Sequence, residues 1–158
     1  MTNKDLGRLT VMCVIAAVWA VAVTEGAVNV LSQPGMIDPI TPETTLQMWQ
    51  AEVREWSWYV LGGALLMAFG WYFYALSRHI RLWHNSVNHR AAWAIGLVLA
   101  GVVAVGGGMQ MTTVDGGIEY VYGVYVFHGC GLYYLTTVLC SPPRWKYTPV
   151  LAAYLRFF

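Results

Sequence analysis

The sequence has little charge for its length. Only 11% of its 158 residues are charged and 58% are hydrophobic, whereas an average soluble domain carries roughly 25% charged residues. A soluble domain of this size cannot cover its surface with so few charges, so the composition excludes a soluble monomer and a disordered chain. The net charge of +1 provides no basic surface, which also excludes a nucleic-acid-binding protein.

The sequence signatures of several chemistries are absent as well. Its cysteines, Cys13, Cys130 and Cys140, show no C-x-x-C spacing, so neither a disulfide-built domain nor a zinc site is indicated. No P-loop, no glycine-rich dinucleotide motif beside a strand and no nucleophile elbow occurs. We therefore predict neither a metal site nor a catalytic residue.

Four long apolar runs without proline dominate what is present. They cover residues 9–31, 56–76, 91–111 and 118–140. Each is long enough to cross the hydrocarbon core, which takes about 20 residues of helix. We predict an all-α integral membrane protein, in which residues 1–158 form a single membrane domain, a four-helix bundle that binds lipid.

The charges of the connecting segments sort by sign. Eight of the nine basic residues lie in the N-terminal tail, the 77–90 connection and the C-terminal tail, and Arg54 alone lies on the other side. Six acidic residues lie in or beside the 32–55 and 112–117 connections. Because basic residues are retained on the cytoplasmic side, both termini are predicted to be cytoplasmic, and the membrane to be a bacterial inner membrane.

Two further segments flank the spans. Residues 42–55 are predicted to form an outer amphipathic helix that runs into the second span, because Leu46, Trp49 and Val53 keep helical spacing. Such a helix lies on the membrane surface or packs on a neighbouring subunit. The tail at residues 141–158 is too short to span, and we predict that it lies along the inner interface or docks on a partner.

A ridge of small residues follows one face of the third span. Gly96, Ala100, Ala104 and Gly108 recur every four residues. Small residues at this spacing let two helices approach closely inside lipid. Contact within the chain's own bundle is the favoured interpretation, and contact with another subunit is the alternative.

His128 lies near the middle of the fourth span, between Val124 and Gly131. An ionisable side chain at this depth suggests function, and its imidazole could bind haem b or a quinone, or relay a proton. The small neighbours Gly129 and Gly131 would leave room for a flat ring. The favoured interpretation is a neutral histidine that hydrogen-bonds inside the bundle, because the other histidines lie too far along the chain to provide a second ligand at this depth.

Glu25 is the only carboxylate well inside a span. Asn29 follows one turn later, and Tyr122 and Tyr125 of the fourth span reach a similar depth. A hydrogen-bonded cluster of these four residues could carry a proton or a cation. The alternative is that Glu25 reaches the outer interface and acts as an anchor.

Two surfaces are predicted to meet lipid or partners. The 77–90 connection contains Arg78, Arg81, Trp83 and Arg90, which enforce topology and can contact acidic headgroups or a partner. The fourth span has a seam of aromatic residues. Its tyrosine hydroxyls cannot all find partners in so small a bundle, which favours a neighbouring subunit; the tyrosines are Tyr120, Tyr122, Tyr125, Tyr133 and Tyr134.

The sequence therefore favours a non-catalytic membrane subunit that anchors or stabilises a larger complex, with other membrane subunits or further copies of the chain as partners. One alternative is a haem- or quinone-binding anchor of an electron-transfer complex, with His128 as a ligand. Another is a small transporter or proton path through Glu25, although little polar lining is available for it.

Overall fold

The computed structural model describes residues 3–36, 38–39, 46–78 and 86–140 of the chain. The described residues form four helices and two short strands: α1 (Asn3–Leu31), β1 (Asp38–Pro39), α2 (Leu46–Arg78), α3 (Ser86–Met109), β2 (Val114–Gly116) and α4 (Ile118–Cys140). The predictions for the tail at 141–158 concern residues outside the described ranges.

All four helices are long and apolar enough to cross a membrane, which confirms the predicted all-α membrane class. The fourth helix has the predicted bounds, whereas α1 and α2 begin earlier than predicted. With 33 residues, α2 is about 50 Å long at the helical rise, and about 20 Å longer than the hydrocarbon core is thick.

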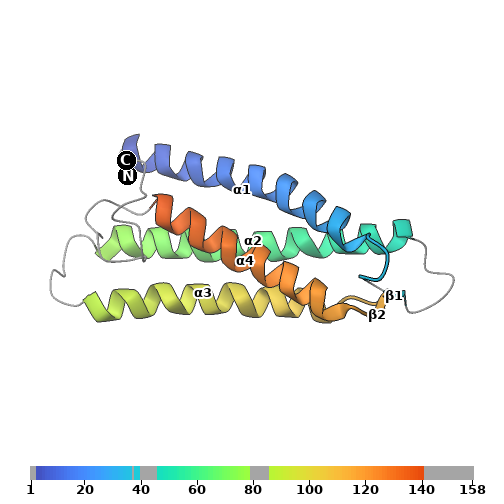
Figure 1. Ribbon diagram of the computed structural model, residues 1–158. Coiled ribbons are helices and arrows are strands. Elements are labelled where there is room, and N and C mark those ends of the chain that lie inside the picture. Colours follow the sequence, from blue (N-terminus) through green and yellow to red (C-terminus); the bar gives the residue numbers. More distant parts are fainter. Residues whose placement is uncertain (1–2, 37, 40–45, 79–85, 141–158) are drawn as a thin grey trace.

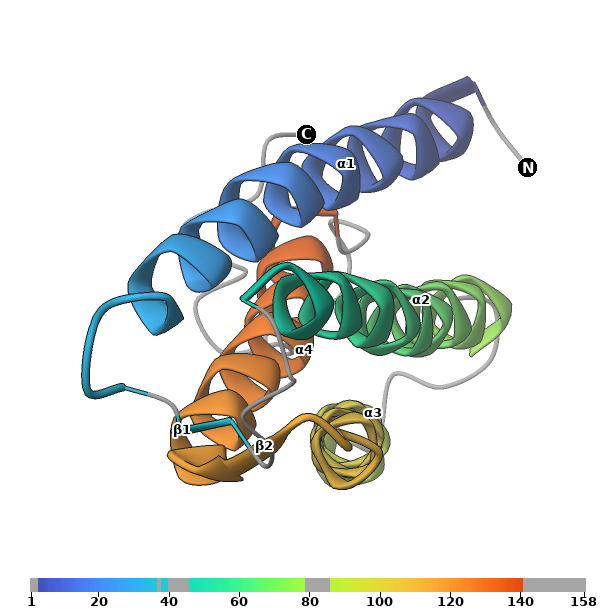
Figure 2. The ribbon, with the colours of Figure 1, turned by 90° about the vertical axis from the view of Figure 1, so that its right-hand side faces the viewer.

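The helices form an antiparallel bundle with α2 and α4 in contact at its centre. Figures 1 and 2 show α1 on one side of this central pair and α3 on the other. One end of the bundle holds the two strands, and we call it the strand end. The opposite end, where α1 begins and α4 ends, is called the terminal end.

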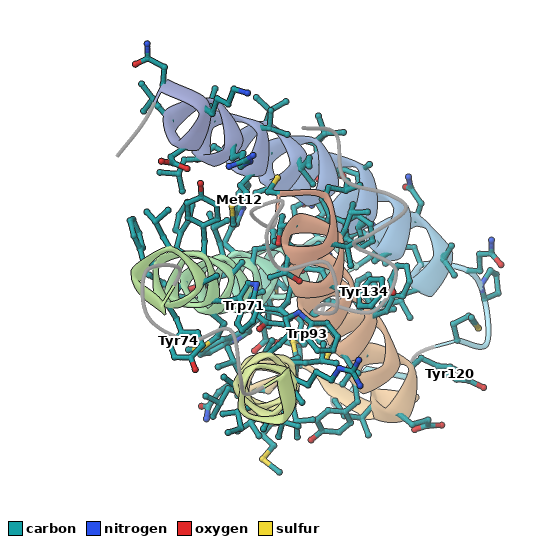
Figure 3. The ribbon with its side chains drawn as sticks, turned by 90° about the vertical axis from the view of Figure 1, so that its left-hand side faces the viewer. Met12, Trp71, Tyr74, Trp93, Tyr120 and Tyr134 are labelled. Carbon is teal, nitrogen blue, oxygen red and sulfur yellow. The ribbon has the colours of Figure 1, made fainter. Side chains whose placement is uncertain are left out.

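Two apolar clusters fill the bundle along its length. Towards the terminal end, the fully buried Tyr133 and Leu132 of α4 pack with Trp71 and Tyr72 of α2. Figure 3 shows Trp71 and Trp93 between α2, α3 and α4, while Tyr120 projects from the edge of the bundle. Towards the strand end, a second cluster joins residues of all four helices: Val28, Leu31, Trp49, Val53, Val60, Ala104, Met111, Val121 and Tyr125.

The described part of the segment predicted as an outer amphipathic helix, residues 46–55, is the first part of α2 itself; residues 42–45 lie outside the described residues. From Leu46 onwards the helix continues into the span without a break. Trp49 and Val53 of this segment pack inside the bundle: Trp49 is 3% exposed, and Val53 is fully buried in the cluster at the strand end. The structure therefore places this apolar side against α1 and α4 rather than on a membrane surface.

The strands tie the two halves of the chain together at the strand end. Asp38 of β1 pairs with Gly116 of β2, and Pro39 pairs with Val114, in antiparallel register. Gly117 follows β2 with φ at 79°, a left-handed backbone conformation that favours glycine. The glycine lets the chain turn from β2 directly into α4.

Candidate functional site

His128 lies where α4 meets α1, and its side chain is 1% exposed. Its Nε2 is 3.3 Å from the hydroxyl oxygen of Thr24 on α1. Its Nδ1 is buried without a hydrogen-bond partner. The Trp19 indole nitrogen donates to the backbone carbonyl of His128 at 3.2 Å. Two residues of α1, Trp19 and Thr24, therefore hold this turn of α4.

The glycines beside His128 are covered by neighbouring side chains and backbone. A Cβ added at Gly131 would lie 2.8 Å from the Trp19 ring, and one at Gly129 would lie 3.2 Å from the Ala100 carbonyl oxygen. The space predicted for a flat ring is therefore occupied by Trp19 on one side and by α3 on the other. The Nε2 atom of His128, which could bind the haem iron, is instead within hydrogen-bond distance of the Thr24 hydroxyl. This geometry does not fit a haem.

The first turns of α2 bind the rest of the strand end through three polar residues, which we call the clamp: Gln50, Glu52 and Arg54. Gln50 and Arg54 are four residues apart and share one face of the helix, whereas Glu52 points to the opposite side. The Gln50 amide donates to the Ser32 hydroxyl at 3.0 Å. The clamp therefore reaches from α2 to both neighbouring connections.

Glu52 joins α2 to the turn between α3 and β2. Its Oε1 accepts hydrogen bonds from the Thr112 amide at 2.9 Å and the Thr112 hydroxyl at 2.7 Å. Its Oε2 accepts from the Thr113 amide at 3.1 Å and also from the Thr113 hydroxyl. A carboxylate that accepts four hydrogen bonds is a strong structural link, because bonds to a charged acceptor are stronger than neutral ones.

Glu25 is paired with Arg54 rather than with tyrosines. The guanidinium donates from Nε to Oε1 at 2.9 Å and from Nη2 to Oε2 at 3.0 Å. The two side chains are 50% and 41% exposed, so the pair lies on the surface of the bundle where α1 and α2 meet. Asn29, one turn further along α1, is exposed too.

The predicted cluster of Glu25 with Asn29, Tyr122 and Tyr125 does not form in the structure. The Tyr125 hydroxyl is buried and donates to the Val53 carbonyl at 3.1 Å. Tyr122 packs its ring over Gly108, where an added Cβ would collide with it. The side chains face different ways, because Glu25 is exposed and pairs with Arg54 of α2, while Tyr125 is buried inside the bundle.

The small-residue ridge of α3 lies against α4. Ala100 and Ala104 are fully buried, and both are close to the backbone position of Gly129. At Gly96 an added Cβ would collide with the Tyr133 ring. The Tyr133 hydroxyl donates to the Trp93 carbonyl at 2.9 Å. The ridge therefore packs against the backbone of α4 and against the ring of Tyr133.

A buried polar cluster at the terminal end escaped the sequence analysis. Asp5 and Arg8, each 6% exposed, form an ion pair at 3.4 Å, and the Tyr72 hydroxyl donates to Asp5 at 3.1 Å. The charge pattern assigns Arg8 to a cytoplasmic N-terminal tail, whereas the structure has it inside α1. The three-residue spacing of Asp5 and Arg8 was the available signal.

The basic connection can be placed only in part. Arg90 is exposed near the start of α3, and Arg78 ends α2. Arg81 and Trp83 lie outside the described residues. Within the described ranges, no group of three or more His, Cys, Asp or Glu side chains could hold a metal ion.

No protein-family model, no curated protein sequence and no solved structure matches this chain.

Proposed function

We propose that the chain is a non-catalytic integral membrane subunit that anchors or stabilises a larger membrane complex. The observation that carries this proposal is that several polar side chains bind one another across the bundle. The pairs join different elements of the bundle: Asp5 with Tyr72, Glu25 with Arg54, Glu52 with Thr112 and Thr113, and Trp93 with Thr137.

Polar groups that bind one another favour a structural role over transport. A proton or cation path needs a row of polar groups that can exchange partners along the membrane. Among the described residues, the buried side-chain nitrogens and oxygens without a partner are Trp49 Nε1 and His128 Nδ1. These two groups belong to different parts of the bundle, at the strand end and in the middle, and they make no row.

The clamp and the strand pair fit a supporting role. Together they join α1, α2 and the α3–α4 connection at one end of the bundle. An end cross-linked in this way offers a partner a fixed surface, which lowers the entropic cost of binding. We place this end outside a bacterial inner membrane and both termini in the cytoplasm, following the sign-sorted charges.

Cysteine labelling tests this orientation. A membrane-impermeant maleimide added to intact cells should modify Gln33→Cys, because Gln33 is exposed at the strand end. The same reagent should not reach Asn85→Cys in the connection between α2 and α3 until the membrane is opened. The unmodified chain reports the background of its native cysteines, and labelling of Asn85→Cys in intact cells would contradict the orientation.

Extraction in a mild detergent tests the proposed role. The chain should co-purify through two chromatographic steps with other membrane subunits in fixed stoichiometry, as measured by native mass spectrometry. A stable, monodisperse species that contains one copy of this chain and no other protein would contradict the proposal. A visible-range spectrum of the same preparation is the second measurement, and a Soret band lost in His128→Ala would favour the haem-binding alternative instead.

A further inference from the structure

The exposed side of α1 is apolar over a defined length. It lies between two exposed charges, Lys4 and Glu25, which are about 32 Å apart along the helix. The exposed residues between them are apolar or small, apart from Thr10, whose hydroxyl donates to the Leu6 carbonyl of the same helix at 3.0 Å. A hydroxyl that bonds to its own helix can face hydrocarbon. The length of this apolar band matches the hydrocarbon core of a bilayer, which is roughly 30 Å thick.

The exposed sides of α2 and α3 show the same pattern. On α3 the exposed residues between Arg90 and Gln110 are all apolar, over about 30 Å of helix. On α2 the exposed residues among those described between Glu55 and Arg78 are aromatic, leucine or glycine, over about 35 Å of helix. The three bands therefore have similar lengths, although Figure 1 shows that α1 is inclined to α3.

At the strand end, these bands stop at one level of the bundle. Arg54, which binds Glu25, directly precedes Glu55. Glu52, less than one turn from Glu55, binds the turn that directly follows α3. On α4 the exposed carboxylate of the first turn lies at the same end. We call the four polar residues at this level the boundary ring: Glu25, Glu55, Gln110 and Glu119.

Beyond the boundary ring, the protein has a polar surface and an apolar interior. The first turns of α2, from Leu46 to Arg54, extend about 13 Å past it along the helix. Inside them, Trp49 packs with Leu31 of α1 in one apolar cluster, and the two residues are 3% and 2% exposed. Exposed polar residues return in this part of the chain: Asn29, Gln33, Gln47 and Thr112. This arrangement is typical of a protein part that is surrounded by water.

We propose that the hydrocarbon of the membrane ends at the boundary ring, so that the strand end stands in water as a folded cap. The cap consists of residues 26–36, the two strands, residues 46–54 of α2 and the turn after α3. Its apolar cluster is stabilised by the exclusion of water, whereas helices inside lipid lack this driving force. The cap goes beyond the proposed function, because its position is the same in either orientation and with or without other subunits.

The partner of the surface just below the cap is the layer of phospholipid headgroups. Trp58 and Tyr59 lie about one turn from Glu55 towards the middle of the span, and each is 60% exposed. Tyr120 follows Glu119 on α4 and is 47% exposed. Tryptophan and tyrosine are enriched at the headgroup level, where the ring meets apolar chains and its polar atom meets water. The aromatic residues of two helices thus lie at the depth that the boundary ring indicates.

Spin labels on α2 test this boundary. The native cysteines are replaced (Cys13→Ser, Cys130→Ala, Cys140→Ala), and single cysteines at Ala51 or Leu66 carry the label in vesicles of phosphatidylethanolamine and phosphatidylglycerol. Both positions are exposed on one helix and differ in depth. Power saturation compares access of oxygen, which concentrates in hydrocarbon, with access of a water-soluble nickel complex. We expect nickel to dominate at Ala51 and oxygen to dominate at Leu66.

A label at Val102, exposed on α3, is the control for the apolar band and should also favour oxygen. Preference of the Ala51 label for oxygen would place the cap inside the membrane and overturn the proposal. A label at Leu66 or Val102 that neither reagent reaches would mean that protein, rather than lipid, covers the band, and would overturn it as well.

Hydroxyl-radical footprinting of the unmodified chain in the same vesicles tests the boundary without replacing a cysteine. Met48 in the cap and Leu66 in the band are 55% and 68% exposed in the single chain, so lipid is what distinguishes them. Relative to the unfolded chain, Met48 should keep most of its oxidation and Leu66 should lose most of it, as measured by mass spectrometry. Equal protection of the two residues, or equal oxidation, would refute the boundary.

Discussion

Replacing Ala104 by leucine is expected to destabilise the bundle by about 1–3 kcal/mol, the usual cost of overpacking a filled core. Ala104 is fully buried, and a Cβ added at Gly129 of α4 would lie 3.4 Å from its methyl group. Three further carbon atoms have no space there, so α3 and α4 must move apart. Loss of stability is measured as a lower melting temperature of the purified chain in one detergent.

Val102→Leu is the matched control for this substitution. Val102 is two residues away on the same helix and 60% exposed, so its side chain can lengthen into the surrounding medium. We expect the control to melt like the wild-type chain and Ala100→Leu to behave like Ala104→Leu. Equal melting of Ala104→Leu and the control would mean that the ridge does not pack against α4.

The second large effect is expected from Glu52→Gln at the strand end. Glutamine retains one carbonyl oxygen, so it can serve Thr112 or Thr113 but not both, and its NH₂ group faces the donors of the other residue. With hydrogen bonds to charged groups each contributing about 1.5–3 kcal/mol, we expect a loss of about 2–3 kcal/mol. The melting temperature in detergent again measures the change.

The matched control is Glu55→Gln, which removes a charge from the same part of α2. Glu55 is exposed, so this control separates the loss of the hydrogen bonds to one of the two threonines from the loss of one negative charge. Proteolysis of the α3–α4 connection should accelerate in Glu52→Gln alone. If both variants melt and digest alike, Glu52 does not hold this turn.

The four helices could be predicted because length and apolarity alone determine a membrane span. The side-chain contacts of the site were harder to predict from the sequence, as Arg54 illustrates. In the sequence it is the one basic residue on the side of the acidic connections, and its partner Glu25 is 29 residues away. Charge counting treats such a residue as an exception to the topology rule. The packing of α1 on α2 decides that it meets Glu25.

The tyrosines show a second limit. The sequence predicts that the five hydroxyls cannot all find partners within one bundle, but it does not tell which of them do; Tyr125 and Tyr133 donate to the backbone carbonyls of Val53 and Trp93. Helix carbonyls usually accept from within their own helix, and a carbonyl has a second lone pair that a neighbouring side chain can use. Sequence spacing gives no information about which carbonyls face another helix.

The order of synthesis gives the clamp a further consequence. Glu25 and Arg54 both belong to the first helical hairpin, so their charges can neutralise each other as soon as α1 and α2 enter the membrane together. Glu52 and β1 must instead wait for the second hairpin, because Thr112, Thr113 and β2 follow α3. Insertion of the charged residues therefore depends on the first half of the chain alone. The links through Glu52 and β1 form only after α3 and the connection that follows it have been made.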